Sequence, residues 1–248
     1  MNAVTGTTWA MFAMQVRVEQ RIFWRNLSSV FFTFVLPLVL LLALWVGDDP
    51  AANVQYIVAL SVFSTGFQGL AIQVAMHRDQ GVLKGLMSTP LRPSVLIMGK
   101  AVSVTIVILV EGVLIVALSA LLFGASFPDH LLALLAFVLL GTATFVSLGF
   151  ALASLVPNAE SAPAVANAAY IGILLSSILL GTINGVPRWL QVVGDVIPFS
   201  PLVEGVERAW VGPWHGVPWT SAGILAAWLV VGVAWTIRRF RWDPSTSS

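Results

Sequence analysis

Long runs of apolar residues alternate with short polar segments along the whole chain. A run of about 20 apolar residues is long enough for a helix to cross the hydrocarbon core of a bilayer. The runs predict six transmembrane helices, over residues 29–46, 54–74, 96–123, 131–155, 163–183 and 220–237. The first run is too long for a signal peptide and no small-x-small cleavage site closes it, so we interpret it as a retained helix.

The segment before the first span, residues 7–26, has the pattern of an amphipathic helix. Apolar residues recur at helical spacing and a stripe of arginines accompanies them: Met11, Met14, Val18 and Ile22, then Arg17, Arg21 and Arg25. We expect this helix to lie in the membrane interface, with its apolar side toward the hydrocarbon and its arginines toward lipid headgroups. A positive anchor that only orients the first span is the alternative, and it predicts the same placement.

The polar segment between the second and third spans contains another short amphipathic pattern. Leu83, Leu86 and Met87 are spaced i, i+3 and i+4. Thr89 precedes Pro90, which ends a helix because the residue before proline is pushed out of helical geometry. Such a short helix needs a surface that buries its apolar side. The lipid interface is one such surface, and a groove on a soluble partner is the other.

The composition excludes a soluble domain. Apolar residue types make up 58% of the chain and charged types 9%, whereas soluble domains average roughly 45–50% and about 25%. The same numbers exclude a disordered chain. The net charge of +1 gives no sign of nucleic-acid binding, and a chain without cysteine has no disulfide framework or thiolate metal site. We therefore expect one integral membrane domain over residues 1–248, with a disordered tail at 242–248.

The distribution of Lys and Arg predicts the orientation in the membrane. With the N-terminus inside, all of these residues except Arg188 and Arg208 lie on the cytoplasmic side of the predicted spans. Because cytoplasmic loops carry an excess of Lys and Arg, the pattern predicts a multi-pass protein of the cell membrane with both termini in the cytoplasm.

Residues that carry chemistry are few. Gly99-Lys100 lacks the other glycines of a P-loop. The three histidines fall in loops on opposite sides of the membrane, and no nucleophile–base or paired-carboxylate set falls within one leaflet. We expect no catalytic residue, metal site or cofactor in this chain, so any ATP hydrolysis would belong to a separate subunit.

Polar residues inside the spans are candidates for a translocation path. They are Ser61, Thr65 and Gln68 in the second span, Glu111 in the third, and Asn167, Tyr170 and Ser177 in the fifth. An acidic side chain at the bilayer centre costs about 2.5–3.5 kcal/mol on insertion scales, so Glu111 must face protein or water. Glu111 either faces a cavity, as a site for a cationic substrate or a conformational lock, or hydrogen-bonds to a neighbouring helix. The two polar stripes likewise either line a cavity or bond between helices.

Two stretches resemble the ABC-2 type export permeases, the membrane subunits of type-2 ATP-binding-cassette exporters, including drug-efflux and daunorubicin-resistance permeases. Residues 78–91 resemble the family's second cytoplasmic segment through Arg78, Asp79, Gly81, Leu83, Leu86, Met87, Thr89 and Pro90. Residues 184–213 resemble its extracellular re-entrant segment through Trp189, Pro198, Glu204 and Arg208. Asp79 replaces the family's usual Glu with a side chain of the same charge. Lys84 replaces a common Glu, and this replacement changes the charge offered to a partner.

The resemblance implies an all-α fold of six transmembrane helices. It adds an N-terminal interfacial helix, a cytoplasmic coupling helix within 78–91 and a re-entrant pair of short helices within 184–213. In the family the coupling helix sits in a cleft of the ATPase subunit, so Arg78, Asp79 and Lys84 would be coupling contacts. The i, i+4 spacing of Glu204 and Arg208 also makes an ion pair available.

The resemblance also implies a function. The chain would be a permease subunit that moves a hydrophobic or amphipathic, drug-like compound out of the cytoplasm or inner leaflet. Its partners would be two copies of an ATPase subunit, which bind ATP and Mg, a second permease copy in a homodimer, and membrane lipids. The second and fifth spans of both copies would build the path. A permease for lipid or polysaccharide export is one alternative, and a membrane scaffold that transports nothing is another.

Overall fold

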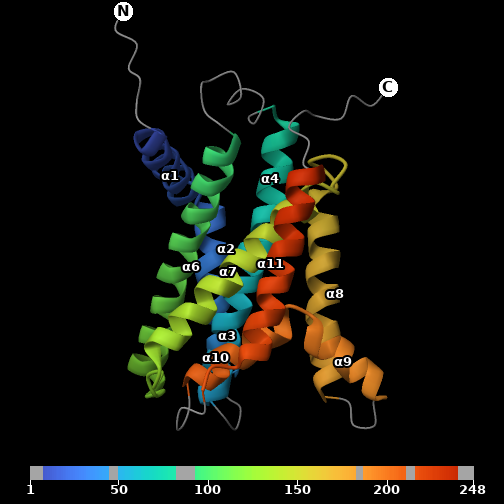
Figure 1. Ribbon diagram of the computed structural model, residues 1–248. Coiled ribbons are helices and arrows are strands. Elements are labelled where there is room, and N and C mark those ends of the chain that lie inside the picture. The colour runs from blue at the N-terminus through green and yellow to red at the C-terminus, as the bar shows by residue number, and fades with distance from the viewer. Residues whose placement is uncertain (1–7, 45–49, 82–92, 183–186, 211–215, 240–248) are drawn as a thin grey trace, which may run out of the picture.

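The computed structural model describes residues 8–44, 50–81, 93–182, 187–210 and 216–239, and these form a bundle of helices without a strand (Figure 1). The elements are α1 (Thr8–Arg25), α2 (Leu27–Leu44), α3 (Pro50–Phe63), the π-helix η1 (Ser64–Gly69), α4 (Leu70–Asp79), α6 (Pro93–Phe123), α7 (Leu131–Ala153), α8 (Ala162–Thr182), α9 (Arg188–Val196), α10 (Phe199–Trp210) and α11 (Trp219–Arg239). The predicted tail lies outside the described residues.

Five described helical stretches are long and apolar enough to cross a membrane, and they correspond to the second to sixth predicted spans. The first of them, Val54–Asp79, joins α3, η1 and α4 and extends beyond the predicted range of 54–74. A sixth crossing arises if α1 and α2, which meet at a bend of 76°, count as one broken span. The protein is therefore an all-helical, multi-pass membrane protein, and the count of six spans stays a prediction.

Asn26 lies at the bend between α1 and α2, directly before the first residue of α2. Its side-chain Oδ1 accepts a hydrogen bond from the backbone N–H of Ser29 at 3.2 Å. An asparagine that accepts such a bond caps the unpaired N–H groups in the first turn of a helix. The bend thus has a local cause in the sequence, and it gives α1 and α2 different directions.

The core of the bundle forms around α7, which crosses it obliquely in Figure 1 and packs against α11, α10, α4 and η1. Phe145 on α7 and Phe63 on α3 are fully buried, with ring centroids 4.7 Å apart. Gly149 on α7 meets the backbone of η1 so closely that an added Cβ would lie 2.8 Å from the carbonyl oxygen of Gly66. Small residues at such contacts let membrane helices approach closely enough to pack.

The bundle has two distinct ends. At one end α4 ends, α6 begins and α11 ends, with α1 beside the start of α6; we call it the α4 end (Figure 1). At the other, the α10 end, α9 and α10 lie beside the ends of the spans (Figure 1). The sequence argument predicts that the α4 end faces the cytoplasm.

The region predicted to re-enter the membrane contains two short helices, α9 and α10. Pro198 is buried between them, and α10 inserts Val206 into the core formed with α3 and α7. Gly205 faces the ring of Phe137 so closely that an added Cβ would overlap it. Trp189 on α9 is 66% exposed. The expected pair of helices is present, and its depth in the membrane stays a prediction.

Candidate functional site

Arg78 lies in the last turn of α4 and its side chain is buried, with 6% exposure. Its guanidinium donates hydrogen bonds to the carbonyl oxygens of Ala153 at 3.0 Å, Val156 at 2.5 Å and Pro157 at 3.5 Å. Carbonyls at the end of a helix have no partner within it, and the helix dipole makes that end negative. The charge of Arg78 therefore satisfies the end of α7 instead of facing solvent.

Asp79 binds the same connection one residue later. Its Oδ2 accepts a hydrogen bond from the backbone N–H of Ala159 at 2.8 Å. Beneath this contact, buried Ala75 on α4 packs against Val156 and Ala162. Arg78 and Asp79 thus hold the 153–159 segment, which joins α7 to α8, against the end of α4. We call these two side chains and that segment the Arg78–Asp79 clamp.

Gly81 follows the clamp immediately and adopts a left-handed backbone with φ of +71°. Residues with a Cβ disfavour this conformation, so glycine suits the turn that ends α4. The Gly81 N–H bonds to the carbonyl of Arg78 at 3.1 Å. The other predicted coupling residues lie outside the described residues: Leu83, Lys84, Leu86, Met87, Thr89 and Pro90.

Glu111 is a buried carboxylate in the middle of α6. Its side chain is 1% exposed, and its Oε2 accepts a hydrogen bond from the hydroxyl of Thr65 at 3.2 Å. Its Oε1 has no hydrogen-bond partner among the described residues. Of the two hypotheses for Glu111, the hydrogen bond to a neighbouring helix matches this geometry.

Thr65 belongs to the π-helix η1, which interrupts the second predicted span. Single π-helical turns within α-helices occur frequently at functional sites. The apolar pattern does not reveal this turn, because every residue around it remains compatible with a helix. One turn earlier, Ser61 is buried and its hydroxyl donates to the carbonyl of Val58 at 3.0 Å in its own helix.

The remaining predicted path residues have partners on neighbouring elements: Gln68 with Asn167, Tyr170 with Phe63, and Ser177 with Ser200. The Gln68 amide donates to Oδ1 of Asn167, the two rings stack with centroids 4.6 Å apart, and the two serine hydroxyls are 2.5 Å apart. Within one chain, Thr65, Gln68, Asn167, Tyr170 and Ser177 therefore bond or pack between elements, whereas Ser61 bonds within its own helix. The polar residues on the second span do not all contact the same neighbouring helix, because η1 changes the rotation per residue.

The opposite side of α8 is exposed along most of its length. Ala164, Ala168, Ile171, Gly172 and Leu175 all lie on this side and are exposed. An added Cβ on Gly172 would meet nothing within 4 Å. Small residues spaced i, i+4 and i+8 let two membrane helices approach closely.

Glu204 connects α10 to its surroundings at the α10 end. Its Oε1 lies 2.8 Å from Nη2 of Arg208, which confirms the ion pair predicted from their spacing. Both side chains are about half exposed, so the pair contributes only about 0.3–0.5 kcal/mol. The Glu204 Oε2 also accepts a hydrogen bond from the hydroxyl of Ser221 on α11. Loss of hydration and the nearby Glu204 carboxylate raise the pKa of Glu207 above that of a free glutamate.

A buried ion pair between α1 and α6 was not predicted from the sequence. Nζ of Lys100 lies 2.7 Å from Oε2 of Glu19, and the two side chains are 8% and 11% exposed. Beside this pair, the Gln20 amide donates to the hydroxyl and the carbonyl of Ser103, at 3.0 and 2.8 Å. Gln15 is also buried against α6. The helix α1 therefore docks on α6 through its polar side.

The exposed side of α1 carries apolar residues, with Trp9 75% and Met14 66% exposed, and it also carries the exposed arginines Arg17, Arg21 and Arg25. The placement of the apolar side toward the hydrocarbon stays a prediction. A signal for the ion pair did exist, since Glu19 is the only acidic residue in 7–26 and Lys100 the only basic residue in 96–123. The pairing itself joins residues 81 positions apart, and a single sequence does not show such a contact.

Within the described ranges, no group of three or more His, Cys, Asp or Glu side chains is placed to hold a metal ion. Comparison with known proteins gives one finding. Residues 50–238 match the family model described as ABC-2 family transporter protein. The matched range contains the Arg78–Asp79 clamp, α9 and α10, and it begins after α2. No curated protein matches the chain.

Proposed function

The chain belongs to the ABC-2 transporter family, since the match covers well over half of it, and we propose that it is the permease subunit of an ATP-driven exporter. Two copies of a separate ATP-binding-cassette subunit would bind ATP and Mg and hydrolyse the nucleotide. This chain would move a hydrophobic or amphipathic, drug-like compound from the cytoplasm or inner leaflet to the outside. The family match carries the proposal, and the Arg78–Asp79 clamp supports a mechanism for it.

Coupling would pass through the α4 end. The segment 82–92 leaves α4 directly after the clamp, and its sequence resembles the family's coupling helix. A force on that segment reaches α4 first. Because Arg78 and Asp79 bond to the 153–159 segment, the same force reaches α7 and α8. Arg78 and Asp79 would therefore act as transmitting residues inside the permease, and the apolar residues Leu83, Leu86 and Met87 would contact the ATPase.

The distribution of basic residues indicates how the protein is oriented in the membrane. The basic residues at the ends of α1 and α11 lie at the α4 end, and in the sequence Lys84 and Arg92 follow the end of α4. The positive-inside rule therefore supports a cytoplasmic α4 end in the cell membrane. The α10 end, with α9 and α10, would face outward and re-enter the outer leaflet.

A second permease copy would pack against the exposed side of α8. This side presents Ala164, Ala168 and Gly172 in a row, and the exposed Asn167, which bonds to η1, lies next to it. Two copies that meet here would place the pairs Gln68–Asn167 of both chains beside the interface. The resulting path would have mostly apolar walls with few polar groups, which favours an amphipathic cargo over a small ion.

The first experiment is gentle affinity purification of the chain from its native membrane, followed by an ATP hydrolysis assay. We expect a stoichiometric P-loop ATPase whose activity is inhibited by vanadate. The double variant Leu83→Asp with Leu86→Asp is expected to remain folded but to lose the ATPase, since the change replaces apolar contacts by charge. The matched control is Val192→Asp with Val193→Asp, which places the same change on exposed residues of α9 at the other end.

Distinct results contradict distinct parts of the proposal. Recovery of the chain alone in several detergents would favour a scaffold that transports nothing. An assembly that survives in the Leu83 and Leu86 variant would exclude the coupling role of that segment. Loss of lipid- or glycan-linked products in a deletion strain, with unchanged drug sensitivity, would contradict a drug-like cargo and would indicate a lipid or polysaccharide instead.

A further inference from the structure

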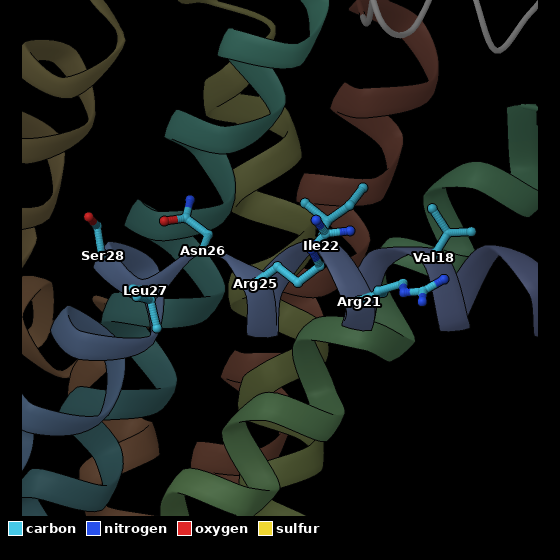
Figure 2. A pocket seen from close by; sticks show the side chains of 7 residues that line it. All are labelled: Val18, Arg21, Ile22, Arg25, Asn26, Leu27 and Ser28. Carbon is cyan, nitrogen blue, oxygen red and sulfur yellow. The ribbon is translucent and has the colours of Figure 1, made fainter.

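A groove of about 630 Å³ lies where α1 meets α2. Its lining comes from one face of α1 and the first residues after the bend: Val18, Arg21, Ile22, Arg25, Asn26, Leu27 and Ser28. Figure 2 shows the two arginine side chains extending along α1 away from the bend, beside Val18 and Ile22. The groove is therefore lined by cations and apolar side chains together.

Arg21 and Arg25 have no counterion among the described residues. Both are exposed, and within the described ranges neither side chain takes part in an ion pair or a hydrogen bond. The acid of α1, Glu19, lies on the other side of the helix and is paired with Lys100. Two like charges held one turn apart without an anion attract one from the surroundings.

The polar groups at the bend face the same groove. Asn26 uses only its Oδ1 to cap α2, so its amide N–H groups remain donors. Ser28 adds an exposed hydroxyl. Together with the arginines, the groove offers four donor side chains and no carboxylate, which is the chemistry that binds a phosphate.

The apolar part of the groove indicates where that phosphate comes from. Leu27 is 80% exposed, and Val18 and Ile22 are 45% and 44% exposed. The bend of 76° separates α1 from α2, which continues with exposed Phe31. A free phosphate or a soluble acidic peptide would leave these apolar side chains uncovered, whereas a lipid covers them with its acyl chains.

We propose that this groove binds one anionic phospholipid, with the phosphodiester between Arg21 and Arg25 and the acyl chains along Leu27 and α2. A zwitterionic lipid brings its own cation and gains less from the arginine pair. Each arginine near an anionic membrane surface contributes about fivefold in affinity, so the pair contributes about 30-fold. The proposal does not depend on an ATPase partner.

Native mass spectrometry of the purified full chain tests this site. The protein in neutral detergent receives phosphatidylglycerol or phosphatidylcholine, and the bound fraction is measured over a concentration series. We expect one phosphatidylglycerol to bind tightly and phosphatidylcholine weakly. Arg21→Gln with Arg25→Gln should lower the phosphatidylglycerol affinity about 30-fold, and Arg21→Lys with Arg25→Lys should lower it less.

The matched control is Arg17→Gln with Arg238→Gln. These two exposed arginines lie outside the groove, and the change removes the same net charge. We expect the control to bind like the unmodified chain, and equal melting temperatures show that all variants fold. An equal loss in the control would overturn the proposal in favour of general charge attraction. Equal binding of both lipids, or displacement of the lipid by millimolar inorganic phosphate, would also overturn it.

Discussion

Replacing Arg78 by Met should destabilise the protein strongly, because the buried guanidinium satisfies the end of α7. The substitution keeps an unbranched side chain of similar length and removes all donors. It leaves the carbonyls of Ala153 and Val156 without their partner, and the backbone around both residues is buried. The carbonyl of Pro157 is a lesser loss, since that residue is exposed and water reaches it.

The size of the effect follows from these contacts. A hydrogen bond from a charged donor contributes about 1.5–3 kcal/mol, so two lost bonds cost about 3–6 kcal/mol. Removal of a buried charge offsets part of this cost, which places the expected loss near 3 kcal/mol. Arg78→Lys retains the charge but replaces the planar guanidinium by a compact ammonium group. We therefore expect it to lose about half as much free energy of unfolding.

Thermal unfolding of the purified protein in detergent measures this loss. A loss of about 3 kcal/mol corresponds to a melting temperature lower by about 6–12 °C for a chain of this size. The matched control is Arg17→Met, at an exposed arginine without a hydrogen bond or ion pair to the described residues, for which we expect a change within about 0.5 kcal/mol. Equal melting temperatures for the Arg78 and Arg17 variants would refute the clamp as a stabilising contact.

Two further substitutions test the contacts that hold the bundle together. Lys100→Met should cost about 3–5 kcal/mol of stability because it leaves Glu19 buried without a cation. Adding Glu19→Gln should restore most of that loss. A double variant no more stable than the single one would contradict the buried pair. Gly149→Ala should cost about 1–3 kcal/mol, since the new Cβ meets the backbone oxygens of Gly66 and Phe67 at 2.8 and 3.0 Å. The control Gly112→Ala meets nothing within 4 Å, so melting temperatures that fall equally in both glycine variants would exclude close packing as the cause.

The helices could be predicted because the apolar run within each span is sufficient to indicate it. The run from Leu131 to Leu155 is apolar enough to cross a bilayer regardless of its neighbours, and the structure has a helix over Leu131–Ala153. The same holds for α1, whose amphipathic spacing is local, and for the cap that Asn26 supplies to α2. Helices are easier to predict from local sequence in a membrane, because backbone N–H and C=O groups in hydrocarbon must find their hydrogen-bond partners within the helix.

The contacts of the candidate site were not predictable in this way. Arg78 was recognised from its motif, but its partners lie 75 and 78 residues further along the chain. Thr65 and Gln68 share a face on an ideal α-helix, and only the π-helix between Ser64 and Gly69 directs them to different neighbours. Such contacts depend on how helices pack, and the spacing of residues in one sequence does not contain that information.

The polar docking of α1 on α6 has a consequence for the order in which the protein is made. Glu19 leaves the ribosome 81 residues before Lys100. At roughly 5–20 residues per second, this interval lasts roughly 4–16 s. During that time the polar side of α1 has no partner helix and is solvated by water at the membrane surface. Docking of α1 is therefore a late step of biogenesis, which becomes possible only after α6 has entered the membrane and brought Lys100 and Ser103 to it.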